Sequence, residues 1–215
     1  MRGIDEAPYR EELDTYSKCM IILKHRFFAA EDILNDKTHY PFQVFKAEAF
    51  CLQFRLIVEL VYVSGLVAQR TANFEGSTKA NRAWRVSEIR EMYGSALDKS
   101  FPWPFEKKAD ATDQTKLDFF ERPVSEDDCF RWFNEMHALL HHQNLYRLTW
   151  EEREKSAESV LSSAGARLTN LWKLLVNHYR HVTDSRGDVF GILCELGNER
   201  TLVPWVGRIS PHPST

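Results

Sequence analysis

The sequence predicts a mainly α-helical protein: a five-helix, up-and-down-type bundle followed by a small C-terminal β-hairpin. Two observations favour this fold class. Apolar residues recur every three or four positions through most of residues 1–183, which is the spacing of amphipathic helices. After "DSRGD" the pattern changes to two β-rich runs, "VFGILCEL" and "RTLVPWVG", and the "GNE" between them is typical of a hairpin turn.

We therefore expect a helical bundle over residues 1–183, a hairpin over 184–209 and a disordered tail over 210–215. Pro204 cannot donate a ladder hydrogen bond, so it predicts that the second hairpin strand is an edge strand. A lone hairpin is only marginally stable in water. The hairpin should consequently dock onto the bundle or onto a second subunit.

The first two helices are predicted at about residues 10–35 and 41–72. The apolar residues at helical spacing in the first helix are Leu13, Tyr16, Met20, Leu23, Phe27, Ala30 and Leu34. Pro41 suits the first turn of the second helix, whose central part is apolar on nearly every side. Such a helix is expected inside a bundle rather than on its rim.

A third helix is expected from about Thr78 to Ala96, with Trp84, Ile89 and Met92 facing inward. Residues 97–124 follow without helical periodicity. They contain three prolines, a charged middle and phenylalanines near both ends. This composition predicts a long loop held by aromatic anchors.

The last two helices each begin with a capping-box pattern. Ser125 with Asp128 opens a helix to about Tyr146, and Thr149 with Glu152 opens another to about residue 182. The inward-facing residues predicted for the final helix are Leu161, Ala164, Leu168, Leu171, Leu175 and Val182.

Charge, cysteine spacing and hydropathy indicate which classes of protein the sequence does not resemble. A net charge of −3 and a pI near 6.3 argue against a broad nucleic-acid-binding surface, but not against a small local one. The four cysteines are far apart in sequence and form no CxxC pair, which is typical of reduced thiols. The first 14 residues lack an apolar core segment, and the most apolar stretch, residues 49–68, carries charges. We expect a cytoplasmic protein with no membrane contact.

Charged residues fall where the second helix should be buried. Arg55 and Glu59 are four residues apart among Leu, Ile, Val and Phe. If both are inside, they must pair with each other, because an isolated buried charge costs several kcal/mol. The pair could be a structural ion pair, a solvated pair at the surface, or part of a functional polar pocket.

The stretch "NEMHALLHHQNLY" (residues 134–146) places three histidines and an asparagine in an otherwise apolar helical segment. At 100° per residue, His137, His141 and Asn144 form a polar stripe along one border of the apolar centre. His142 lies on the other, solvated side. The stripe is either a working site or a helix edge whose imidazoles bond to backbone or carboxylate partners.

His137 and His141 also have the i, i+4 spacing of metal ligands. A zinc site needs a third protein ligand, and only an unproven arrangement of the chain would bring His178 or Glu59 close enough. We therefore expect no metal. The sequence also lacks a Gly-rich phosphate loop and a nucleophile elbow, and no cofactor is expected.

Part of the chain resembles bacterial helical proteins of unassigned function. In these, an Arg-x-x-x-Glu helix precedes a Trp-containing helix, a Pro-aromatic loop and a Leu-Leu-His-x-x-Asn helix. The matching residues here are Arg55, Glu59, Trp84, "FPWP" at 101–104, Leu139, Leu140, His141 and Asn144. The resemblance covers residues 45–146 and implies no particular activity.

The chain also resembles the HEPN superfamily, helical bundles found in nucleotide-binding proteins and in metal-independent ribonucleases of bacterial defence and toxin systems. Active members carry Arg, four to six residues and then His on a late helix, and Arg131 and His137 meet that spacing. Trp132 stands where those members usually have a polar residue. The six-residue step separates Arg131 and His137 by about 120°, so a dimer would have to unite them.

The function we predict first is a HEPN-like helical module that binds a partner or small ligand without chemistry of its own. Its expected site is a polar pocket between helices, built from Arg55, Glu59, His141 and Asn144. We expect a homo-oligomer or a protein partner, with RNA or a nucleotide as a further candidate. A third hypothesis makes the chain a subunit of a larger assembly that docks through the hairpin and the 97–124 loop.

The alternative is a metal-independent ribonuclease of toxin or defence type. His137 would act as general acid or base on the ribose 2′-hydroxyl, and its ordinary pKa near 6.5 suits that work. Arg131 would bind the phosphate and stabilise developing charge. Sequence reasoning alone leaves open whether the protein is an enzyme.

Overall fold

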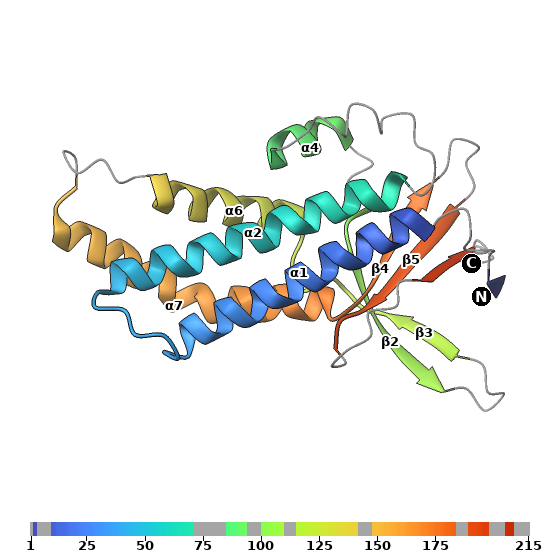
Figure 1. Cartoon of the computed structure of the whole chain (residues 1–215), viewed down its shortest axis with the longest axis horizontal. Helices are drawn as coiled ribbons and strands as arrows, with labels where there is room; N and C mark the ends of the chain where they lie inside the picture. Colours follow the sequence, from blue (N-terminus) through green and yellow to red (C-terminus); the bar gives the residue numbers. More distant parts are fainter. Residues whose placement is uncertain are drawn as a thin grey trace. The chain divides into compact units, whose positions relative to one another are not determined.

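The computed structural model describes residues 2–3, 10–70, 85–93, 100–109, 115–141, 148–183, 189–197 and 205–208. The protein is mainly helical and carries an antiparallel β-sheet, as Figure 1 shows. The chain divides into two compact units. The sheet unit comprises Met1–Ile21, Val61–Arg122 and Lys173–Thr215, and the helical unit comprises Ile22–Leu60 and Pro123–Trp172.

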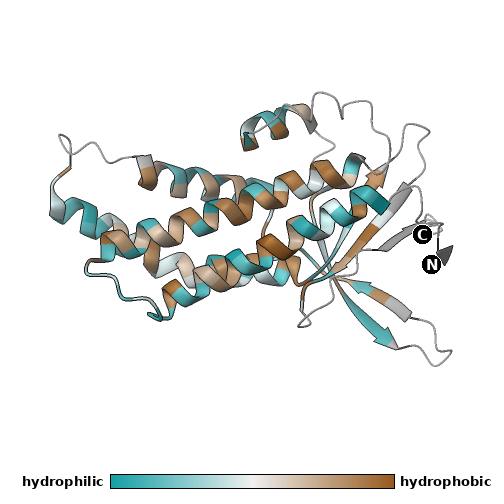
Figure 2. Ribbon diagram, viewed as in Figure 1, coloured by the Kyte–Doolittle hydropathy of each residue, from teal (hydrophilic) through white to brown (hydrophobic). Residues whose placement is uncertain are grey.

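The first two helices form where the periodicity predicts them. They are α1 (Arg10–Leu34) and α2 (Gln43–Arg70). The apolar stripe of α1 is buried through Tyr16, Met20 and Leu23, all with no exposed surface. Hydrophobic residues run along most of α2 in Figure 2. The prediction of a core helix is confirmed in part, because buried residues run along most of α2 but Phe45 and Leu52 are 41% and 44% exposed.

Among the described residues, one helix is long and apolar enough by composition to cross a membrane. It is α2 over Gln43–Gln69, and 61% of its most apolar window is buried within the fold. The core helix of a folded domain meets the same criteria, so the burial accounts for the apolar composition.

The third predicted helix is described only in part. The helix α4 covers Val86–Tyr93, with Ile89 buried as expected. The remaining residues predicted for this helix, 78–84 and 94–96, lie outside the described part of the chain and include Trp84.

Both predicted helix N-caps are confirmed, the second of them as a complete capping box. The helix α6 (Glu126–His141) begins after Ser125, whose hydroxyl accepts the Asp128 amide proton at 3.1 Å. The helix α7 (Trp150–Leu175) begins after Thr149, which exchanges hydrogen bonds with Glu152 in both directions. The backbone N–H groups of the first helical turn have no acceptor within the helix, and each cap supplies one.

Within the described residues, the sheet has six strands in the order β1-β6-β5-β4-β2-β3, and every neighbouring pair is antiparallel. The strands are β1 (Arg2–Gly3), β2 (Trp103–Ala109), β3 (Thr115–Phe119), β4 (Asn177–Thr183), β5 (Val189–Glu195) and β6 (Trp205–Arg208). The sheet belongs entirely to the sheet unit.

The prediction that the last helix runs to residue 182 is wrong. The helix α7 ends at Leu175, and the next residues form β4, which pairs with β5 over all seven of its positions. His178, Tyr179, Arg180 and Val182 are all buried there. Residues buried on both faces of a strand give no period-2 pattern, so the segment looked like a continuation of the apolar helix.

The prediction of a long loop over residues 97–124 is also wrong. Its centre forms the antiparallel pair β2–β3, with Phe105 opposite Phe119. Arg122 holds the base of this ribbon, because its guanidinium donates to the carbonyls of Phe101 and Pro102 and lies 4.0 Å from the Trp103 ring. The predicted aromatic anchors are confirmed at the first end, where Phe101 and Phe105 are buried, but Phe119 and Phe120 at the other end are exposed.

The C-terminal hairpin is confirmed in part. β5 pairs with β6, but residues 198–204, including Pro204, lie outside the described residues, as does the tail at 210–215. The expectation of an edge strand is wrong, because β6 also pairs with β1. The hairpin does not stand alone: β5 pairs with β4, so the sheet itself supplies the support that a hairpin requires.

Candidate functional site

The predicted ion pair on α2 exists in the helical unit. Nε of Arg55 lies 2.9 Å from Oε1 of Glu59, and each side chain is 28% exposed. The pair is therefore half-buried rather than sealed in the core. At this exposure it stabilises the fold modestly, and both groups remain accessible to a polar partner.

Phe133 on α6 connects this pair to one of the predicted histidines. The Arg55 guanidinium lies 5.8 Å from the centre of the Phe133 ring, and the His137 imidazole stacks on the same ring at 6.1 Å with planes 16° apart. The structure thus brings Arg55 and His137 to a common aromatic side chain. Attraction between a cation and an aromatic ring is worth about 0.5–1 kcal/mol at exposed sites.

The other two residues of the predicted polar pocket are His141 and Asn144. His141 is the last residue of α6, and its side chain lies outside the described part of the structure. Asn144 also lies outside it. The pocket of Arg55, Glu59, His141 and Asn144 stays a prediction.

Arg131, the phosphate ligand of the ribonuclease alternative, lies on the exposed face of α6. Its side chain is 63% exposed and pairs with Asp128 at 2.6 Å and with Glu135 at 3.9 Å. These are i, i+3 and i, i+4 contacts on one helix. Carboxylates of its own helix thus compete with any phosphate for this guanidinium.

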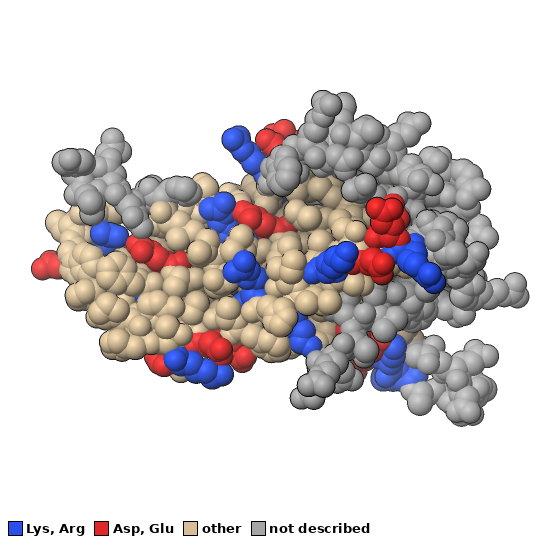
Figure 3. Space-filling model, in the orientation of Figure 1, with Lys and Arg blue, Asp and Glu red and all other residues tan. Residues whose placement is uncertain are grey.

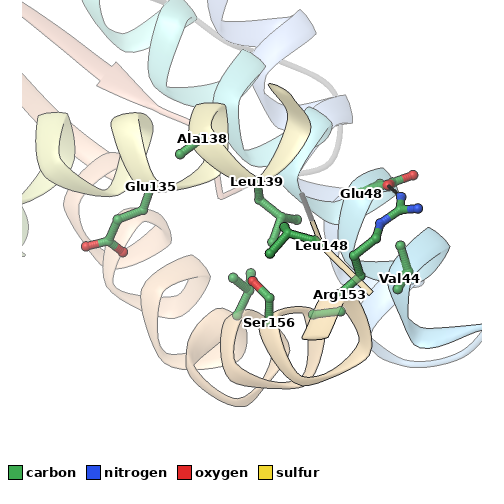
Figure 4. Close-up of a pocket in the computed structure, with 10 residues that line it drawn as sticks. Val44, Glu48, Glu135, Ala138, Leu139, Leu148, Arg153 and Ser156 are labelled. Atoms are coloured by element: carbon green, nitrogen blue, oxygen red, sulfur yellow. Dashed lines mark hydrogen bonds and ion pairs between the residues drawn. The ribbon is translucent and has the colours of Figure 1, made fainter. Parts of the chain in front are cut away.

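A pocket of about 470 Å³ lies in the helical unit between α2, α6 and α7 (Figure 4). Its lining residues are Val44, Glu48, Glu135, Ala138, Leu139, Leu148, Arg153, Ser156, Ala157 and Val160. The space exists because Ala138, Ser156 and Ala157 are too short to fill the gap between the helices. A volume of this size is within the range of small-molecule sites, roughly 300–1,000 Å³.

The pocket wall is apolar except at a few defined points. The Arg153 guanidinium lies 3.2 Å from a Glu48 carboxylate oxygen, and the two side chains are 15% and 21% exposed. It also lies 5.4 Å from the centre of the Trp150 ring. Ser156 adds a hydroxyl from α7 (Figure 4). An apolar wall with a few fixed polar groups is typical of a ligand site.

Sequence reasoning missed a buried polar cluster in the sheet unit, centred on Arg180 of β4. Arg180 is 2% exposed. Its guanidinium donates to the Tyr16 hydroxyl at 3.0 Å, the Ser64 hydroxyl at 2.8 Å and the carbonyls of Ser100 and Val61 at 2.9 and 2.8 Å. All these acceptors are uncharged. Four hydrogen bonds to uncharged acceptors thus stabilise a buried guanidinium that has no carboxylate among its described partners.

His178 belongs to the same cluster, and its two hydrogen bonds define which ring nitrogen carries the proton. Its Nδ1 lies 2.7 Å from the Leu175 carbonyl, which can only accept, so Nδ1 carries the proton. Its Nε2 therefore accepts from the Tyr16 hydroxyl at 2.6 Å. Burial, together with the nearby Arg180 charge, lowers the pKa of His178 to about 3. The ring is neutral at ordinary pH.

Neighbouring groups of this cluster are held in their uncharged forms. Burial raises the pKa of the Tyr16 hydroxyl and raises the pKa of the Cys194 thiol to about 12. Both effects make these side chains poor nucleophiles. The cluster therefore has the properties of a structural network, and His178 is committed to partners other than a metal.

No sequence signal marks the cluster, because its members come from α1, α2, β4 and the segment before β2. The sequence predicted that the small pocket residues Ala138, Ser156 and Ala157 lie on helices, but it did not predict a cavity beside them. Among the described residues, no group of three or more His, Cys, Asp or Glu side chains is placed to hold a metal ion.

Charged side chains of both signs lie on the face of the protein that Figure 3 shows. On the face shown in Figure 3, basic and acidic side chains of the described residues alternate rather than gather into a patch. Several exposed ion pairs join residues close in sequence, such as Lys37 with Asp32 and Arg131 with Asp128. On this face the described residues form no continuous basic stripe of the kind that binds nucleic-acid backbones.

Comparison of the chain with protein-family models, with curated proteins and with solved structures gave no match. Fold and site define a mainly helical protein with an antiparallel sheet and an apolar pocket between three helices.

Proposed function

We propose that this protein is a binding module that holds a small, mostly apolar ligand in the pocket between α2, α6 and α7. The observation that supports the proposal is the pocket itself, a hollow of about 470 Å³ with a largely apolar wall. Burying apolar surface supplies about 25 cal/mol per Å², so an apolar ligand gains affinity there without any charged contact.

The polar groups of the pocket favour a neutral ligand with one hydrogen-bond acceptor. Among the described residues, the Arg153 guanidinium donates to Glu48 through one of its five N–H groups. A carbonyl or hydroxyl oxygen could accept from a remaining donor. A ligand carboxylate would have to compete with Glu48 for the same guanidinium, and this argues for an uncharged head group.

The proposed function is still the binding module predicted from the sequence, but its pocket is built from different residues. The expected pocket lay between the second and fourth predicted helices, with Arg55 and Glu59 as its polar groups. The pocket that supports the proposal also uses α2 and α6, but it lies beside Glu48 and includes α7. Membership of the HEPN superfamily, the homo-oligomer, the RNA or protein partner and the cytoplasmic location stay predictions.

The test uses an uncharged fluorescent probe, N-phenyl-1-naphthylamine, whose emission rises in apolar surroundings. Ser156 lines the pocket and is itself exposed, so Ser156→Phe should fill the space and leave the fold intact. We expect saturable binding by the unmodified protein and a loss of affinity of at least about tenfold in Ser156→Phe, which corresponds to about 1.4 kcal/mol.

Ser162→Phe is the matched control. Ser162 is also an exposed serine of α7, but six residues on, which turns it about 240° around the helix from Ser156. Its variant should bind the probe as the unmodified protein does. Equal binding by the Ser156→Phe variant, or no saturable binding by the unmodified protein, would contradict the proposal.

A further inference from the structure

The β2–β3 ribbon ends the sheet in a free edge. Among the described residues β3 pairs with β2 alone, and β2 pairs with β4 only at Trp103 and Pro104 (Figure 1). An edge strand presents a row of backbone donors and acceptors that another strand can complete.

The hydrogen-bond pattern identifies the outward-facing backbone groups. The Phe120 amide donates to the Pro104 carbonyl at 3.1 Å, so residues 120 and 104 form a hydrogen-bonded pair. Such pairs alternate along an antiparallel ladder. The backbone groups of residues 118 and 116 therefore point toward β2, and those of Thr115, Leu117 and Phe119 point toward the free edge.

The outward-facing backbone groups of β3 can pair with the same groups of a second β3 strand. If a second β3 approaches antiparallel with its Leu117 opposite the first Leu117, Thr115 of each strand faces Phe119 of the other. All three outward-facing residues on each strand then meet outward-facing residues, which allows six backbone hydrogen bonds around a two-fold axis. A self-complementary patch of this kind is the geometry of an isologous dimer.

The charges along the strand fit the same register. Within the ribbon, like charges stand directly opposite each other: Glu106 faces Asp118, and Lys108 faces Lys116. Like charges directly opposite each other in a sheet are destabilising, and Asp118 forms an ion pair with the diagonal residue Lys108 at 2.6 Å. The antiparallel second copy would place Lys116 opposite Asp118 on both sides of the axis.

We propose that the free edge of β3 is an interface with a second copy of this chain, in which two β3 strands pair antiparallel about Leu117. Phe119 is 49% exposed and Phe120 is 41% exposed at the end of the strand, so aromatic surface lies beside the backbone contact. This interface belongs to the sheet unit and does not depend on the ligand pocket.

Two five-residue strands form a small contact. Stable interfaces bury about 1,200–2,000 Å² in total, so the dimer should be weak and should depend on protein concentration. Sedimentation velocity over a range of concentrations measures that dependence directly. The unmodified chain should shift from monomer to dimer as its concentration rises.

A proline at the centre of the strand tests the edge. Leu117→Pro removes an N–H that points outward and keeps the bonds from β3 to β2, so it should leave the chain monomeric. Leu117→Ala removes the same side chain but keeps the N–H, so it should still dimerise. Far-UV circular dichroism of both variants checks that the ribbon remains folded.

A charge-swap mixture tests the register. Alone, Lys116→Asp places Asp opposite Asp118, and Asp118→Lys places Lys opposite Lys116, so each variant should be monomeric. Mixed, the two variants place opposite charges at both positions and should form a heterodimer. A merely structural effect of either substitution would not be reversed by mixing.

Three outcomes overturn the proposal. The first is a monomeric unmodified chain at every concentration, which is also the result expected if the edge instead binds a strand of another protein. The second is a Leu117→Pro variant that dimerises like the unmodified chain, because the dimer would then use another surface. The third is a mixture of charge variants that remains monomeric.

Discussion

The Nε–H of Arg180 on β4 donates a hydrogen bond of 3.0 Å to the Tyr16 hydroxyl on α1, although the two residues are 164 positions apart in the sequence. The same hydroxyl donates to His178, so a single oxygen joins the strand to the helix through two contacts. A buried network of this kind fixes how its elements pack, because an unmade bond inside the protein costs more than one at the surface.

Removal of Arg180 should therefore destabilise the protein strongly. Arg180→Met keeps a long apolar side chain but leaves two carbonyls and the Ser64 hydroxyl without this donor. We expect a loss of unfolding free energy on the order of 3 kcal/mol, measured by urea denaturation. Arg131→Met, at an exposed position, should change it by less than about 0.5 kcal/mol, and a similar loss in both variants would argue against the network.

Two helical glycines should respond to alanine with opposite signs. A Cβ at Gly65 of α2 would lie 3.2 Å from Nη1 of Arg180, and this guanidinium cannot move without losing its hydrogen bonds. A Cβ at Gly165 of α7 would meet nothing within 4 Å. Gly165→Ala should therefore stabilise the protein by about 0.5–1 kcal/mol, from helix propensity alone.

Gly65→Ala gains the same propensity but should lose more to the close contact. The thermal unfolding midpoint should consequently rise for the Gly165 variant and fall for the Gly65 variant. A rise in both would mean that Arg180 has room to move and that the packing around it is looser than the hydrogen bonds indicate.

Stability should decline in mild acid because of His178. Burial lowers the pKa of its imidazole to about 3 in the folded protein, whereas the unfolded chain has the ordinary value near 6.5. The unfolded state then binds the extra proton, so this contribution is complete above pH 6.5 and is lost as the pH falls toward 3. The slope is at most about 1.4 kcal/mol per pH unit.

The comparison is between the unmodified protein and His178→Gln, with unfolding free energies measured from pH 7 down to pH 4. The variant should show a shallower decline over this range. His25→Gln, at an exposed histidine of α1, should keep the original slope. Identical slopes for all three proteins would show that His178 is not held neutral by the fold.

The ribonuclease alternative makes a different and simple prediction. Arg131 is engaged by Asp128 and Glu135, and it lies on the exposed face of its helix. We therefore expect no cleavage of total RNA by the pure protein in EDTA. Chelator-resistant cleavage that disappears in His137→Ala would establish the enzyme and displace the binding module.

The sequence by itself determined the helices that depend on local rules. The bounds of α1 and α2 follow from spacing and Pro41, and the starts of α6 and α7 follow from Ser125 and Thr149. The ion pair of Arg55 with Glu59 was also predictable, because four residues make one helical turn. Periodicity, caps and i, i+4 contacts all act within a few residues, so a single sequence contains them.

Tertiary structure alone decided the rest. Nothing local distinguishes Arg180 or His178 from residues of a long final helix, and only the pairing of β4 with β5 makes them part of a sheet. The β2–β3 ribbon and the pocket beside Ala138 arise in the same way, from partners distant in the chain. Strand pairing and cavities depend on which segments meet, and the pattern of one segment does not specify its partner.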